Sequence, residues 1–276
     1  MEQWDAAKYL SNTNNIAAKI VARHYIRRTT YHRNKALKYA NAVVTISEWH
    51  RTQLLRYNTN TYVIYNGFNE QQASLKPLPS EFFYITYSGK IYNLNLRNPQ
   101  LLFSALHNMF ARHTIDRERT RVVFYIEQEA SETIRRLADE YGLGDSVEIR
   151  HFISPQELLH VMQQSSICLI LNNPSTHEQI HGIIPSKFFE ALGAQRPVLC
   201  VPADHDSLQE IVEQTHAGLC TDNEKQIETF ISSLYRQWEK QRYVVQPTTQ
   251  QQREPFARAQ QVKQYEQIIQ TITHDA

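Results

Sequence analysis

Short apolar runs alternate with amphipathic segments along most of this 276-residue chain. Residues 122–126 and 167–171 are continuously apolar, which is typical of parallel strands covered by helices on both faces. Strands are predicted at 83–87, 121–126, 147–150, 167–171, 197–201 and just after Gly218, with helices at 98–111, 129–141, 155–165, 186–193, 206–215 and 224–240. The pattern predicts an α/β fold, a doubly wound parallel sheet of Rossmann-like type, which binds ligands at the carboxyl ends of its strands.

The pattern changes on either side of this predicted domain, residues 81–244. Residues 1–69 favour helices at 4–25 and on to about residue 39, then a strand at 42–46, a helix from 48 and a strand from 62. They predict a partial second α/β domain. Residues 70–80 contain two prolines and are interpreted as a linker. Residues 245–276 are expected to form a Gln-rich connector and a terminal helix, 255–272, that packs back on the amino-terminal part.

One predicted helix begins with residues suited to an anionic, hydroxyl-rich ligand. Pro185 suits the first helical position, because its φ is helical and it has no N–H to satisfy. Ser186 and Lys187 add a hydroxyl and a cation where the first amides and the helix dipole favour phosphate. Glu190 lies roughly 7 Å further along the axis, where a carboxylate can accept hydrogen bonds from a diol. Gly193 is expected to end the helix.

Composition narrows the class of protein. No apolar run is long enough to span a bilayer, and the polar amino terminus predicts a cytoplasmic protein. The three cysteines lack metal-site spacing and are expected to be buried thiols. Residues 1–51 carry nine Lys and Arg against three acids. This basic region allows peripheral membrane contact, although a solvated helix face is favoured, and no nucleic-acid motif accompanies it.

A zinc motif overlaps the same region. His177, Glu178 and His181 satisfy H-E-x-x-H, which on a continuous helix places two imidazoles beside a general base, as in metalloproteases. Pro174 before the motif and Gly182 after it leave barely one helical turn, and no third ligand has suitable spacing. Metalloprotease activity is therefore the remote alternative, and no metal site is expected.

Four segments, in order, resemble the carboxyl-terminal donor-binding half of a family 4 glycosyltransferase of the GT-B fold. They are residues 41–47 (NAVVTIS), 64–68 (IYNGF), 87–90 (YSGK) with Arg97, and 184–190 (IPSKFFE). The resemblance covers roughly residues 36–240. It implies transfer of a sugar from a nucleotide-sugar donor to an acceptor, with retention of anomeric configuration and usually without a bound metal.

The resemblance also implies roles for individual residues. Gly89 would let the backbone approach the diphosphate, with Lys90 beside it, and Arg97 and Lys187 would meet the charge. Pro185, Ser186 and the helix amides would bind the same group, and Glu190 would hold the ribose. Phe152 and Ile153 fall in the loop that meets the base. Fixed cations and amides would stabilise the negative charge that grows on the departing diphosphate.

Three departures from the family accompany the resemblance. Gly182 stands where many members have a glutamate, and Glu127 with Gln128 replaces a glycine after the second strand. Only about 70 residues precede the linker, against roughly 150 for a complete amino-terminal domain. We therefore expect the acceptor site, for a glycan or lipid-linked acceptor, to be incomplete. The alternatives are a truncated enzyme, a cleft completed by a partner chain or oligomer, and a non-catalytic nucleotide-sugar-binding or scaffold protein in polysaccharide assembly.

Overall fold

The computed structural model describes residues 15–172 and 181–274. The chain folds into two compact units. The smaller unit comprises Met1–Val63 with Ile268–Ala276, and the larger comprises Ile64–Gln267. The larger unit contains the predicted Rossmann-like sheet, so it positions every residue of the candidate site.

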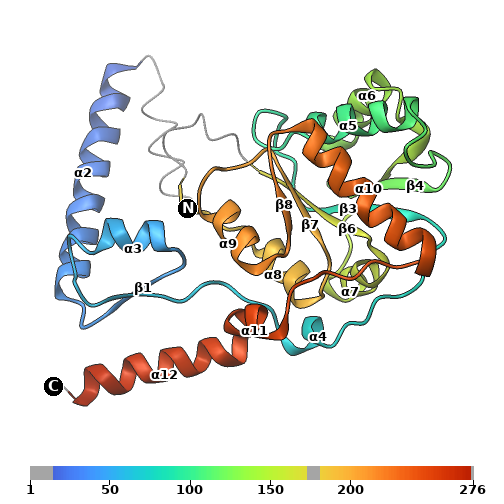
Figure 1. Cartoon of the computed structure of the whole chain (residues 1–276). Helices are drawn as coiled ribbons and strands as arrows, with labels where there is room; N and C mark the ends of the chain where they lie inside the picture. Colours follow the sequence, from blue (N-terminus) through green and yellow to red (C-terminus); the bar gives the residue numbers. More distant parts are fainter. Residues whose placement is uncertain (1–14, 173–180, 275–276) are drawn as a thin grey trace. The chain divides into compact units, whose positions relative to one another are not determined.

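The larger unit is built on a six-stranded parallel sheet (Figure 1). Its strands are β3 (Phe83–Ser88), β4 (Thr120–Tyr125), β5 (Val147–Arg150), β6 (Ile167–Leu171), β7 (Val198–Val201) and β8 (Gly218–Cys220). The order is β5-β4-β3-β6-β7-β8, so the direction of winding reverses between β3 and β6. This order confirms the predicted doubly wound fold, and ligands in such folds bind at the reversal point.

Helices cover both faces of the sheet. They are α5 (Gln100–Ala111), α6 (Gln128–Glu140), α7 (Pro155–Gln164), α8 (Ser186–Gly193), α9 (Ser207–Thr215) and α10 (Glu224–Gln241), with a 3-10 turn at Gly144–Ser146. Ile167, Leu169 and Leu171 join the core on the α5, α6 and α10 side, whereas Ile170 joins the core on the α7, α8 and α9 side. Since successive strand residues face opposite ways, a strand buried on both faces must be apolar throughout.

α8 ends at Gly193, as the sequence predicts, but this glycine has no positive φ. Gly193 is the last helical residue, while Ala194 caps the helix and Gln195 adopts the positive φ of 55°. A Cβ on Gly193 would lie 2.5 Å from the Phe68 side chain. Gly193 therefore serves close packing of α8 against the segment that enters the larger unit, and not a change of backbone direction.

Short elements occupy the segments on both sides of the sheet domain. α4 (Glu70–Ala73) forms inside the segment interpreted as a linker, where Asn69 caps it and exchanges hydrogen bonds with Gln72. α11 (Gln250–Arg253) and a 3-10 turn (Glu254–Phe256) lead into α12 (Arg258–His274). Phe68 pairs with the backbone beside Ala257, so the two ends of the larger unit are bonded to each other.

The smaller unit contains α2 (Ile16–Tyr39), β1 (Val43–Thr45), α3 (Glu48–Leu54) and β2 (Thr61–Val63). β1 and β2 pair in parallel, which fits the predicted partial α/β domain. Residues 16–39 form one helix, and the earlier part of the predicted helix lies outside the described residues. α2 carries seven Lys and Arg and no acid. Among the described helices, none combines the length and the apolar character that crossing a membrane requires.

Candidate functional site

Gly89 and Lys187 meet at the carboxyl ends of the strands, where the winding reverses. Gly89 follows β3 with φ of 148°, and its amide donates to the Tyr125 carbonyl of β4 over 3.1 Å. A Cβ built on Gly89 would collide with Nζ and Cε of Lys187. A side chain at position 89 would have to displace this ammonium group, and the φ of 148° independently favours glycine. The structure thus brings together two residues predicted from separate motifs almost one hundred positions apart.

The Lys187 ammonium occupies a half-buried, partly cationic environment. Its Nζ lies 5.2 Å from the centroid of the Tyr87 ring, a cation–π distance. Burial lowers the pKa of Lys187, and the nearby Arg97 lowers it further, against the opposing effect of Glu190 and Glu127. The folded protein therefore disfavours the charge on Lys187, and an anionic ligand would remove part of that cost.

Arg97 belongs to the same cluster. It lies in the segment between β3 and α5, where its Nη1 donates to the Leu96 carbonyl over 2.8 Å. Burial raises the pKa of Tyr87 to about 12, while Arg97 lowers it through charge and a hydrogen bond. Tyr87 therefore stays neutral and donates to the Lys90 carbonyl over 3.0 Å, which holds the loop after β3. Arg97 and Lys187 thus bring two cations to this loop.

Glu190 lies one helical turn beyond Lys187 on α8. Burial raises the pKa of Glu190, and Lys187 and then Arg258 lower it. A hollow of about 30 Å³ borders Lys187 and Glu190 together with Thr86 and Ser165. This volume is about that of one water molecule. Glu190 is thus a partly buried carboxylate beside a cation, able to accept hydrogen bonds from a bound hydroxyl pair.

Glu127 is a site residue whose contribution the sequence does not reveal. It follows β4 at the position where a glycine was expected, and its Oε2 accepts from the Ile91 amide over 3.3 Å. Its charge also acts on both Tyr87 and Lys187. Glu127 therefore ties the loop after β3 to the neighbouring strand and partly balances the two cations.

The beginning of α8 differs by one residue from the prediction. Pro185 is the N-cap, with ψ of 140°, and Ser186 is the first helical residue. The physical reason is that the cap residue must be extended while its carbonyl already accepts, here from the Phe188 amide over 3.0 Å. Ser186 and Lys187 therefore supply the first helical amides, and the Ser186 side chain is exposed.

Three predicted residues lie outside the Gly89–Lys187 contact. The Lys90 side chain is exposed, and only its backbone carbonyl is engaged, by Tyr87. Phe152 and Ile153 follow β5, and Phe152 is 46% exposed. They lie at the same carboxyl edge of the sheet as Gly89, two strands away in the sheet order. Their predicted role with a base stays a prediction.

The segment before α8 is bonded to a carboxylate, Asp206, that the sequence does not predict for the site. Gly182 is buried with φ of 71°, and its amide donates to Oδ2 of Asp206 over 2.8 Å. Burial raises the pKa of Asp206, but hydrogen bonds from Gly182 and Ser207 outweigh it and lower the pKa overall. A backbone in this region favours glycine over the glutamate of many relatives. Asp206 therefore places a carboxylate beside position 182 from a different element.

The alternative zinc motif is only partly described. His177 and Glu178 lie outside the described residues, and the Nδ1 atom of His181 is 3.2 Å from Oδ2 of Asp206. Within residues 15–172 and 181–274, no group of three His, Cys, Asp or Glu side chains is arranged to hold a metal ion.

Comparison with known proteins assigns the family. The sequence profile of the family described as "Glycosyl transferases group 1" matches residues 70–251. The chain belongs to this glycosyl transferases group 1 family. No curated protein sequence matches the chain significantly. The matched range includes every residue of the cluster around Gly89 and Lys187.

Several solved structures are similar to this chain in fold. A glycosyltransferase from Rickettsia africae has a TM-score of 0.64 at 13% identity, over 88% of this chain and 67% of that one. Sucrose-phosphate synthase from Thermosynechococcus elongatus has a TM-score of 0.62 at 15% identity, over 98% and 66%. Anabaena HepE in complex with UDP-glucose has a TM-score of 0.61 at 15% identity, over 94% and 68%. The chain thus spans about two thirds of the length of these proteins.

Proposed function

We propose that this chain binds a nucleoside-diphosphate sugar at the carboxyl ends of β3 and β6 and forms the donor half of a retaining glycosyltransferase. The observation that carries the proposal is the Lys187 ammonium held against Gly89, beside Arg97, at the reversal point of the sheet. The structurally similar Anabaena HepE was solved with UDP-glucose. Retention is inferred from the family 4 resemblance of the sequence.

The proposed chemistry is cleavage of the bond between the sugar and the diphosphate. Negative charge grows on the diphosphate as this bond breaks, and groups that meet it more strongly in the transition state accelerate the step. Lys187, Arg97 and the first amides of α8 are such groups. Because they are fixed before the donor arrives, they need little reorganisation during the reaction.

The acceptor side is proposed to lie outside the donor half. A glycan or lipid-linked acceptor would then be held by residues beyond the cluster described above, in the smaller unit, in a longer protein or in a partner chain. The basic helix α2, with seven cations and no acid, suits contact with an anionic membrane surface. A cytoplasmic site of action stays a prediction.

Calorimetry with UDP, GDP and ADP tests donor binding, and Glu190→Ala tests the ribose contact. We expect the variant to bind the preferred nucleotide about 10- to 100-fold more weakly, because hydrogen bonds to a charged group are lost. The control ligand is the 2′,3′-dideoxy nucleotide, which lacks both ribose hydroxyls. Its affinity should therefore not change when Glu190 is replaced. Glu210→Ala, at an exposed glutamate of α9, is the control variant.

Two results would contradict these assignments. Equal losses for the ordinary and dideoxy nucleotides would remove Glu190 from the ribose, and failure of all three nucleotides to bind would remove the donor site. Release of UDP from UDP-glucose, followed by chromatography, then separates a transferase from a non-catalytic binding protein. A binding protein would retain the sugar nucleotide intact.

Nucleotide affinity should also depend on pH through Lys187. Because burial and Arg97 lower the pKa of Lys187, this side chain loses its proton at a lower pH than an ordinary lysine. UDP affinity should fall as pH rises through that lowered pKa, and this fall should be absent from Lys187→Arg, whose guanidinium stays protonated. Calorimetry from neutral to alkaline pH measures both curves. Identical curves for the two proteins would show that another group controls the fall.

A further inference from the structure

A second, larger cavity lies at the carboxyl edge of the sheet, on the side covered by α5 and α10. Its volume is about 720 Å³, within the roughly 300–1,000 Å³ of small-molecule sites. Asn172, which follows β6, and Pro202, which follows β7, line it together with the segment that leads into α5. Neither Lys187 nor Glu190 contributes to this cavity. It therefore adjoins the strand ends that carry the donor site but uses different side chains.

Amides dominate the polar lining of this cavity. Asn95, Asn98, Gln100 and Asn172 line it, and Glu224 is the only Asp, Glu, Lys, Arg or His among its described lining residues. With a carboxylate and no cation among these described lining residues, the cavity disfavours phosphate. Amides and a carboxylate instead suit a neutral ligand rich in hydroxyl groups, which both donate and accept hydrogen bonds.

Hydrogen bonds hold part of this lining in place. Oδ1 of Asn98 accepts from the Gln100 amide over 2.9 Å, and Nε2 of Gln100 donates to the Tyr141 hydroxyl over 2.8 Å. The Tyr141 hydroxyl accepts that bond and keeps its own proton for donation. A ligand hydroxyl would thus meet donors and acceptors whose positions are already set.

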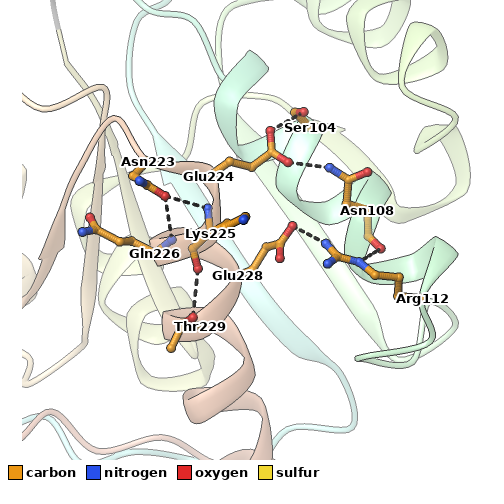
Figure 2. A network of polar contacts seen from close by, with 9 residues as sticks. All are labelled: Ser104, Asn108, Arg112, Asn223, Glu224, Lys225, Gln226, Glu228 and Thr229. Carbon is orange, nitrogen blue, oxygen red and sulfur yellow. Dashed lines mark hydrogen bonds and ion pairs between the residues drawn. The ribbon is translucent and has the colours of Figure 1, made fainter.

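Glu224 is also fixed before any ligand binds. Figure 2 shows its carboxylate on the first turn of α10, facing Ser104 and Asn108 on α5. Oγ of Ser104 donates to Oε2 over 2.7 Å, and Nδ2 of Asn108 donates to Oε1. Each carboxylate oxygen can accept more than one hydrogen bond, so acceptor capacity remains after these two contacts.

Apolar groups complete the cavity. Leu94, Leu101 and Pro202 line it beside the polar groups, and apolar atoms make up the larger share of its exposed lining. A sugar ring presents C–H groups on its faces and hydroxyls at its edge, so it matches a site with both kinds of surface.

We propose that this cavity binds neutral sugar units of a glycan beside the donor site. Its role in transfer rests on the proposed function, whereas its saccharide chemistry rests only on the lining residues. The donor diphosphate is not its ligand, because Glu224 opposes an anion there.

Saturation-transfer NMR with the neutral trisaccharides maltotriose, cellotriose and N,N′,N″-triacetylchitotriose tests the proposal. We expect at least one trisaccharide to bind. The Asn98→Ala substitution should weaken its affinity about three- to tenfold through lost hydrogen bonding. Asn95→Trp, at an exposed position, should block the cavity without disturbing the core. Glu118→Ala, at an exposed glutamate that lines a different cavity, is the control and should bind the trisaccharide normally. Thermal melts check that each variant is folded.

The outcomes separate this cavity from the donor site. The Lys187→Ala variant should lose nucleotide affinity and still bind the trisaccharide. The Asn95→Trp variant should keep nucleotide affinity and lose trisaccharide binding. The saccharide assignment would be overturned if no trisaccharide binds, or if Asn95→Trp leaves trisaccharide binding intact. Neither result would bear on the donor site. Tighter binding of the anionic trigalacturonate than of any neutral trisaccharide would also overturn the assignment.

Discussion

Replacing Lys187 with alanine should lower UDP release from UDP-glucose by roughly 10²–10³-fold, the loss typical of one preorganised charge-stabilising group. The free energy of unfolding of the ligand-free chain should not fall together with the rate of UDP release. Burial lowers the pKa of Lys187, so the unfolded chain holds this proton more tightly than the folded one. The folded state is therefore penalised at neutral pH, and the penalty disappears only as pH rises above the ordinary pKa of lysine. Removing the ammonium removes the penalty at every pH.

Steady-state release of UDP and thermal melting, measured on the same preparations, check both parts of this prediction. Lys240→Ala is the matched control, because this lysine is exposed near the end of α10. It should keep the turnover of the parent chain. An alanine variant at position 187 that melts well below the parent would indicate a structural role for Lys187. Turnover within threefold of the parent would remove Lys187 from the reaction.

The fold follows from local pattern because the inner strands of the sheet are buried on both faces. Residues 167–171 form a strand with the bounds that their apolar run predicts, and residues 147–150, where apolar and charged residues alternate, form a strand with the predicted bounds as well. The sequence predicts a doubly wound sheet, while the order of its strands comes from the structure. The reason why a helix ends at a given residue follows less directly from the sequence. α8 ends at Gly193 as the sequence predicts, but the Phe68 ring that excludes a side chain there is visible only in the structure.

The candidate site likewise contains residues that a local motif predicts and residues that only the structure reveals. Gly89, Arg97, Lys187 and Glu190 were predicted from motifs, and the structure places them around one another at the reversal point. Glu127 and Asp206 were not assigned to the site, because each acts through a backbone amide distant in sequence, Ile91 and Gly182 respectively. No spacing within one segment reports such a contact. A side chain that folds back onto a loop is visible only once the strands are ordered.

Substituting Gly89 with alanine should lower UDP release about tenfold or more, because it acts on Lys187 in addition to straining the backbone. The added Cβ would occupy the position of the Lys187 ammonium, and a φ of 148° costs a non-glycine residue on the order of 1–3 kcal/mol. Gly144→Ala is the control, because its Cβ would meet only the flexible end of Asp139, at 2.6 Å. UDP release and thermal melting distinguish the two variants.

A double-mutant cycle separates the two effects of the Gly89 substitution. If the Cβ acts by displacing the ammonium, Gly89→Ala should lower turnover much less in a Lys187→Ala background than in the parent chain. The backbone strain does not depend on Lys187, so the drop in melting temperature should be similar in both backgrounds. Losses of turnover that add in the double variant would show that Gly89 and Lys187 act independently. In that case the loop after β3 would contact the donor through its own backbone, with the lysine as a separate anchor.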